Sequence, residues 1–167
     1  MDRAPGRALG LDLGARRIGV ALSDSLRTIA SPYAVLERSG DLARDRATIA
    51  ALIEEVRATV CVVGLPLALD GRIGVAARGA LDEAAALGEL LDVPVVTADE
   101  RMTTVEVERR RLEHAALADA GRRGGRGARR SSAYGAARSR ARPIVDDAAA
   151  AVMLQAWIEA DTDRDER

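Results

Sequence analysis

The chain has 167 residues, of which 48% are hydrophobic, and this length and composition predict one globular domain with a full core. A single histidine and a single cysteine exclude a zinc site of the usual ligand spacing and an internal disulfide, and a lone cysteine fits a reducing compartment. No signal peptide and no apolar run of membrane-spanning length is present, so we expect a cytoplasmic protein that has no membrane partner.

The formal net charge of −1 conceals a strong segregation of charge along the chain. Residues 115–142 carry eight arginines and one acid, whereas residues 159–167 carry five acids and two arginines. A basic segment of this kind favours binding to a nucleic-acid backbone, because it releases condensed counterions. The same composition is also typical of a solvated Arg/Gly/Ser loop that has no ligand, and the sequence leaves both readings open.

Two apolar runs at residues 8–13 and 18–22 predict a β-hairpin around a turn at residues 14–17. Asp12 interrupts the first run just before Gly14, and a buried carboxylate costs several kcal/mol unless it is paired. A metal ion is a natural partner for a carboxylate at a strand end, although Asp12 could also cap the turn. Arg16 and Arg17 place two cations beside this acid, where they could contact phosphate or remain solvated.

A third strand is predicted at residues 29–36, where Pro32 indicates a sheet edge or a bulge. Asp24, before this strand, is expected to be a cap or a hydrogen-bond partner. Helical and strand patterns then alternate, which predicts parallel strands connected by helices. The predicted elements are a helix at 41–57, a strand at 60–63, a helix at 75–91, a strand at 93–97, a helix that begins near Thr103, and a last helix at 145–160. The first of these helices has an apolar face made of Leu42, Ile49, Leu52, Ile53 and Val56.

This order of elements predicts an α/β fold with a five-stranded mixed sheet flanked by helices. The sheet would combine a three-strand meander with two parallel strands, and the first strand would be central. We expect a single domain over residues 1–160, with an Arg-rich loop at about 118–142 and an acidic tail at 161–167.

Ligands of α/β sheets gather at the carboxyl ends of the parallel strands. In this chain those ends supply Asp12, residues 64–66 and Glu100. The two acids are 88 positions apart in the sequence, and we expect the fold to bring them together. Glu100 could instead be a solvated acid that is favoured by the dipole of the helix that follows it.

Four segments of the chain carry these residues: GLDLGARRIGVALSD, VVGLPLALDG, ADERMTTVEVE and IVDDAAAAVMLQAW. They resemble, in the same order, the four conserved blocks of the YqgF (RuvX) family. The resemblance implies an RNase H-like fold and a link to pre-16S rRNA processing and Holliday-junction resolution. It also implies an acidic site made of Asp12, Glu100 and Asp146. Residues 122–142 depart from the family pattern, because this segment looks longer and richer in Arg, Gly and Ser than the usual short basic linker.

Three acids in one cleft would repel one another without a cation. Two Mg²⁺ ions about 3.5–4 Å apart can activate water and stabilise the leaving oxygen of a phosphodiester. Carboxylates are suitable ligands for Mg²⁺, so the predicted cofactor is Mg²⁺ or Mn²⁺.

Asp146 lies roughly 30° from the centre of the apolar stripe of the last predicted helix and Asp147 roughly 70°, which favours Asp146 as the third acid. Asp146 could also be only the N-cap of this helix.

The sequence therefore predicts a metal-dependent endonuclease, a hydrolase of ester bonds, that acts on structured nucleic acid. The favoured role is processing of the 5' end of pre-16S rRNA in ribosome biogenesis. The alternatives are a Holliday-junction resolvase in DNA recombination and repair, and a non-catalytic RNA-binding assembly factor. Actin-like ATPases and sugar kinases share the GLDLG-type hairpin but need about twice this length.

The expected partner is pre-16S rRNA or branched DNA, bound by a monomer or a homodimer. Only three aromatic residues are present, so recognition through stacked bases is not expected. We expect the protein to recognise the shape and the charge of the nucleic-acid backbone instead. The candidate nucleic-acid contacts are Arg16, Arg17, Arg101, Arg122, Arg123, Arg126, Arg129 and Arg130.

Overall fold

The computed structural model describes residues 6–68, 70–100 and 148–165. The strands are β1 (Arg7–Leu13), β2 (Arg17–Ser23), β3 (Ala30–Glu37), β4 (Ala58–Leu65) and β5 (Val95–Asp99). The helices are α1 (Leu42–Val56), α2 (Val75–Leu90) and α4 (Ala148–Asp165). The helix expected near Thr103 and the Arg-rich loop lie outside the described residues. None of the described helices is long and apolar enough to cross a membrane.

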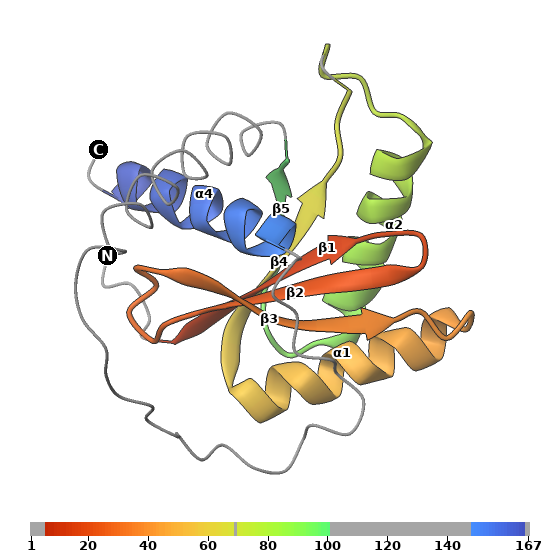
Figure 1. Ribbon diagram of the computed structural model, residues 1–167, viewed down its shortest axis with the longest axis horizontal. Coiled ribbons are helices and arrows are strands. Elements are labelled where there is room, and N and C mark those ends of the chain that lie inside the picture. Colours follow the sequence, from red (N-terminus) through yellow and green to blue (C-terminus); the bar gives the residue numbers. More distant parts are fainter. Residues whose placement is uncertain (1–5, 69, 101–147, 166–167) are drawn as a thin grey trace, which may run out of the picture.

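The strands form one mixed sheet in the order β3-β2-β1-β4-β5 (Figure 1), and β1 is central as predicted. β1 pairs antiparallel with β2, β2 pairs antiparallel with β3, and the pairs β1–β4 and β4–β5 are parallel. The meander and the two parallel strands are therefore confirmed. Pro32 lies in the edge strand β3 next to a shift in register, where its missing N–H is tolerated.

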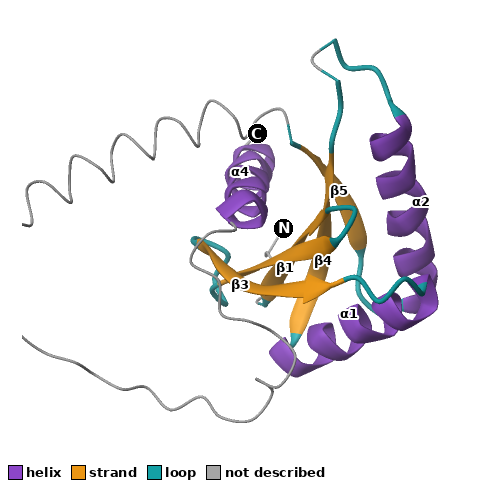
Figure 2. Ribbon diagram, turned by 45° about the vertical axis from the view of Figure 1, so that its right-hand side comes forward, coloured by secondary structure: helices purple, strands orange, loops and turns teal. Residues whose placement is uncertain are grey.

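The two faces of the sheet carry separate cores (Figure 2): α1 and α2 cover one face and α4 covers the other. Side chains alternate between these faces along β1, so Leu9 and Leu11 pack with the α1 and α2 side, whereas Ala8 packs with α4. Gly10 lies directly beneath α4, because a Cβ at Gly10 would be only 3.0 Å from the Cβ of Leu154. This glycine allows the last helix to approach the sheet closely.

Polar contacts also fix the helices. In α1, Asp41 is the N-cap and accepts hydrogen bonds from the backbone N–H groups of Ala43 and Arg44. Arg46 of α1 donates two hydrogen bonds to the buried carboxylate of Glu83 in α2, at 3.1 and 2.9 Å. These charge-assisted bonds fix how the two helices lie relative to each other.

The structure corrects one residue of the predicted apolar face of α1. Ile49, Ile53 and Val56 are buried, but Leu42 is 52% exposed. The first turn of α1 is anchored by a polar residue instead, because the buried Asp45 accepts hydrogen bonds from the N–H and the hydroxyl of Ser39.

Several element boundaries differ from the predicted ones. β5 begins at Val95 rather than at residue 93, because Pro94 cannot donate to the sheet and only its carbonyl bonds, to the N–H of Cys61. At its other end the strand continues beyond the predicted residue 97 to Asp99, directly before Glu100. α4 continues past residue 160 to Asp165, since no glycine or proline interrupts residues 160–165.

Candidate active site

The alternation of side chains brings three positions to one corner of the sheet on the α4 face. Along β1, every second residue faces α4, so Asp12 follows Ala8 and Gly10 on this face. The same spacing places Gly64 of β4 after Val62, and Glu100 after Ala98 of β5. Because β1, β4 and β5 are parallel, these positions share the carboxyl edge of the sheet.

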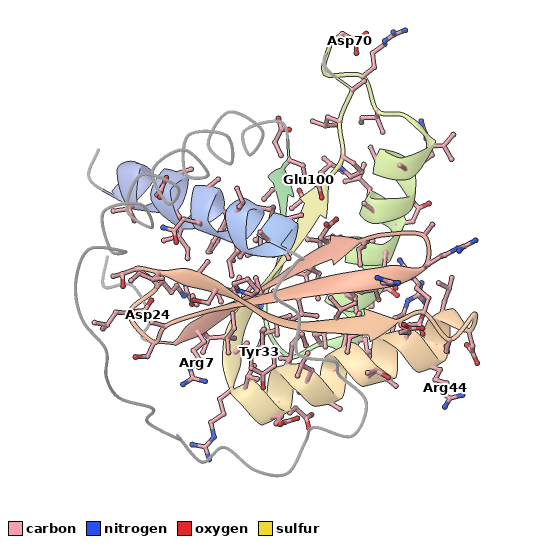
Figure 3. All side chains as sticks on the ribbon, in the orientation of Figure 1. Arg7, Asp24, Tyr33, Arg44, Asp70 and Glu100 are labelled. Atoms are coloured by element: carbon pink, nitrogen blue, oxygen red, sulfur yellow. The ribbon has the colours of Figure 1, made fainter. Side chains whose placement is uncertain are left out.

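Glu100 and Asp12 meet at this edge, as expected from the strand order. A side-chain hydrogen bond joins the two carboxyl groups. Burial, the charge of Asp12, this hydrogen bond and the charge of Asp99 together raise the pKa of Glu100 from 4.5 to about 7. Figure 3 places Glu100 at the end of β5. The fold therefore juxtaposes two acids that are far apart in the sequence, in a partly buried setting.

Asp12 and Glu100 provide hard oxygen donors of the kind that Mg²⁺ and Mn²⁺ prefer. Because the charge of Asp12 raises the pKa of Glu100, a cation bound between the two carboxyls would also relieve their repulsion. Within the described parts of the chain, no group of three acidic, histidine or cysteine side chains could hold a metal ion. Asp146, the expected third acid, lies outside those parts, as does its neighbour Asp147.

Gly64 occupies the strand position between the two acids. An ideal Cβ built on Gly64 would overlap Oε1 of Glu100 and would lie 3.1 Å from its Cδ. The sequence predicts Gly64 at a strand end but indicates no role for it. The available signal was a glycine at the end of an apolar strand, which can mark a close approach of other atoms.

The turn between β1 and β2 lies next to Asp12, and Arg16 in this turn and Arg17 at the start of β2 are both exposed. Arg38 supports this turn from the end of β3. Its Nε donates to the carbonyl of Gly14 at 3.0 Å, and its backbone N–H donates to the carbonyl of Arg16 at 2.9 Å. No local sequence pattern marks Arg38, because its role depends on the pairing of β2 with β3.

Arg38 is itself held by the buried Asp45, whose Oδ2 lies 3.7 Å from its Nη1. Hydrogen bonds from Ser39 and the charge of Arg38 hold the pKa of Asp45 below its usual value. The hairpin turn beside Asp12 is therefore anchored to the start of α1. The other candidate contacts, Arg101, Arg122, Arg123, Arg126, Arg129 and Arg130, lie outside the described residues.

Asp24 belongs to the opposite end of the sheet, in the turn between β2 and β3, well away from Glu100 (Figure 3). Its carboxylate accepts hydrogen bonds from the N–H groups of Thr28 and Ile29 and from the Thr28 hydroxyl. The structure confirms that Asp24 is a hydrogen-bond partner.

Comparisons with known proteins agree with this fold and with the motifs. The model of the RuvX family, described as "Holliday junction resolvase", matches residues 6–126. A protein of Roseiflexus sp. named "Putative pre-16S rRNA nuclease" is 43% identical over 68% of this chain and 79% of its own length. A protein of the same name from Mycobacterium bovis is 38% identical over 95% of this chain and 81% of its own length.

Among solved structures, RuvC of T. thermophilus in complex with a Holliday junction substrate is similar, with a TM-score of 0.54. The likeness covers 94% of this chain and 96% of RuvC, and a second structure of Thermus thermophilus RuvC gives a TM-score of 0.52. At 15% and 14% identity these likenesses show the RNase H-like fold alone. The family description and the relatives' names indicate a nuclease, which is a hydrolase acting on ester bonds. The chain belongs to the RuvX family.

Proposed function

We propose that this protein is a divalent-cation-dependent endonuclease that acts in the cytoplasm and processes the 5' end of pre-16S rRNA. The observation that carries this proposal is the meeting of the Asp12 and Glu100 carboxyls at the carboxyl edge of the sheet. Two further findings support it: the family membership and the names of relatives that align over most of the chain.

Asp12 and Glu100 would hold the cation, together with Asp146 as the family resemblance implies. When bound, Mg²⁺ or Mn²⁺ supplies an activated water and stabilises charge on the leaving oxygen of the phosphodiester. Without a cation, a pKa of about 7 leaves a large fraction of the Glu100 carboxyls protonated near neutral pH, which limits the repulsion from Asp12.

Arg16 and Arg17 would bind the phosphates on either side of the scissile bond. Both are exposed, Arg16 in the turn next to Asp12 and Arg17 at the start of β2, and the contacts of Arg38 with Gly14 and Arg16 fix this turn. Arginine suits this task because its planar guanidinium can donate two parallel hydrogen bonds to one phosphate. The basic residues of the segment 122–142 would extend the same electrostatic contact along the nucleic-acid backbone.

A second candidate function is the resolution of four-way DNA junctions, which the family description favours. It would use the same acids and the same backbone contacts, and a homodimer would supply one site to each of two strands. A non-catalytic RNA-binding role is less favoured. Two carboxylates at the binding surface would repel the phosphates of RNA and weaken binding unless they hold a cation.

The deciding experiment compares two substrates in parallel: a labelled pre-16S rRNA fragment with its 5' extension, and a labelled four-way junction. Each is incubated with Mg²⁺, with Mn²⁺ or with EDTA. We expect cation-dependent cleavage of the RNA and little cleavage of the junction. Preferential cutting of the junction would establish the second candidate, and binding without cleavage of either substrate would overturn the nuclease proposal.

Replacing either acid tests the assignment of the site. Asp12→Asn or Glu100→Gln should abolish cleavage, a larger loss than the about 10–100-fold cost of removing a residue that only supports a metal ligand. The melting temperature of the metal-free protein should hold or rise, since one of two close acids is neutralised. Undiminished cleavage by either variant, in a preparation free of contaminating nuclease, would contradict the assignment.

The neighbouring acids before α4 provide a matched pair for the third position. Asp146→Asn should cripple cleavage and Asp147→Asn should largely spare it. The helical periodicity predicted from the sequence over residues 145–160 would place only Asp146 near the centre of the apolar stripe. The opposite ranking would mean that the register of the last helix relative to the site is wrong.

A further inference from the structure

Glu100 has to cross a whole strand to reach Asp12. β4 lies between β5, which ends just before Glu100, and β1, which carries Asp12. Neighbouring strands are about 4.8 Å apart, so the backbones of β1 and β5 are separated by about 10 Å. The Glu100 side chain must therefore pass over the backbone of β4.

The crossing point is Gly64. It pairs with Ala98 in β5, two residues before Glu100, and follows Val63, which pairs with Leu11 in β1. A Cβ at this position would overlap Oε1 of Glu100 and would crowd its Cδ and Cγ, at 3.1 and 3.2 Å. All three atoms belong to the Glu100 side chain, so the space above Gly64 is the space that the Glu100 carboxyl occupies.

The backbone conformation does not explain the glycine. Among the described residues, the glycines with positive φ are Gly6, Gly40 and Gly71, and Gly64 is not one of them. An alanine could adopt the backbone conformation of Gly64 without strain. The overlap falls on the far end of a flexible side chain, so an added methyl group would displace the Glu100 carboxyl rather than the strand.

We propose that Gly64 is a positioning residue that holds the Glu100 carboxyl against Asp12 by leaving its path across β4 open. This inference rests on the proposed function, because the acidic pair is the part of the nuclease site that Gly64 would set. Gly64 contacts no substrate in this role and acts only through Glu100.

The test is Gly64→Ala, compared with Gly79→Ala as a matched control. Gly79 in α2 has no atom within 4 Å of its built Cβ, so the control adds the same methyl group in open space. Two quantities are measured: the affinity for Mn²⁺ without nucleic acid, and the kcat and KM for cleavage of the rRNA fragment. We expect Gly64→Ala to weaken Mn²⁺ binding and to lower kcat by about 10–100-fold, the usual cost of losing support for a metal ligand. KM and the melting temperature should stay near their wild-type values.

A double-mutant cycle separates positioning from a general structural effect. In a Glu100→Ala background no carboxyl lies over Gly64, so adding Gly64→Ala should leave the remaining Mn²⁺ affinity unchanged. Equal losses in both backgrounds would overturn the positioning role. Loss of the fold in Gly64→Ala would also overturn it, because the methyl group would then have displaced the strand.

The outcomes distinguish this inference from the function on which it rests. A Gly64→Ala protein that binds Mn²⁺ and cleaves RNA like the wild type would remove the positioning role and leave the nuclease proposal intact. A wild-type protein that neither binds Mn²⁺ nor cleaves either substrate would overturn both.

Discussion

Asp24 shows how a single acid can organise a turn. Its two carboxylate oxygens accept hydrogen bonds of 2.6 and 2.9 Å from the N–H groups of Thr28 and Ile29, and one of 2.7 Å from the Thr28 hydroxyl. These bonds lower the pKa of Asp24 from 3.8 to about 2, and the bond from Ile29 makes the largest contribution to this shift. The ionised form of Asp24 therefore stabilises the connection between β2 and β3.

This lowered pKa predicts a defined pH dependence of stability. Since the pKa in the folded state lies below the unfolded value, the contribution of Asp24 is complete above about pH 4 and is lost as the pH falls toward 2. Asp24→Asn should lower the melting temperature at pH 7 by about 2–4 °C, the shift expected for about 1 kcal/mol. The difference from wild type should shrink between pH 4 and pH 2.

Thermal unfolding followed by circular dichroism over this pH range measures the effect. Asp70→Asn is the control, because Asp70 is an exposed acid paired with an exposed arginine, and such pairs contribute little to stability. A difference between wild type and Asp24→Asn that is as large at pH 2 as at pH 7 would contradict the prediction.

The candidate site could be predicted from the sequence only in part. The rule that ligands gather at the carboxyl ends of parallel strands was sufficient to predict that Asp12 and Glu100 lie close together. The roles of Gly64 and Arg38 could not be foreseen, because each depends on register. Gly64 matters since β4 lies between the two acids, and Arg38 matters since the end of β3 adjoins the hairpin turn.

At the scale of elements, the packing of α4 on β1 depends on the absence of a side chain at Gly10. The nearest atom to a built Cβ would be the Cβ of Leu154, which is attached directly to the helix backbone and cannot rotate away. An added methyl group would therefore have to move α4 relative to the sheet.

Gly10→Ala should destabilise the protein by about 1–3 kcal/mol, the usual cost of overpacking a core. Gly79→Ala should stabilise it by about 0.5–1 kcal/mol, because alanine is the better helix former and nothing lies near the added methyl group. Urea unfolding of the two variants measures both changes. A neutral Gly10→Ala would show that α4 adapts to the extra methyl group without cost.

The periodicity of the sequence predicted the described helices and strands, but not every boundary or every buried residue. Apolar spacing correctly predicted the packed face of α1 apart from Leu42, which is exposed. It did not identify Asp45 and Glu83 as buried, because each is stabilised by a polar partner outside its own helical pattern: Ser39, just before α1, for Asp45, and Arg46 of α1 for Glu83 of α2. Burial of a charge depends on such tertiary partners, which local patterns do not report.

For the whole molecule, the segregation of charge along the sequence is the property with the clearest consequence for binding. Deleting residues 122–140 removes seven arginines without removing an acid. If these arginines contact phosphates, the deletion should weaken nucleic-acid binding and flatten its salt dependence. Each lost contact should reduce the slope of log K against log salt by about 0.7–0.9.

Binding isotherms at several salt concentrations test this prediction. A variant in which the same seven arginines are lysines keeps the charge and should largely keep the slope, because counterion release depends on charge. If the deletion leaves the slope unchanged, the segment is a passive loop and the remaining arginines account for binding.

The strand order also determines when the acidic pair can exist during synthesis of the chain. β1 leaves the ribosome before β4, and β4 before β5, yet the carboxyls of Asp12 and Glu100 meet only across a finished β1-β4-β5 array. Both parallel pairings need a completed helical crossover, and contacts between distant segments form slowly. A nascent chain that has not yet reached Glu100 holds half of the pair, so the site is completed late in folding.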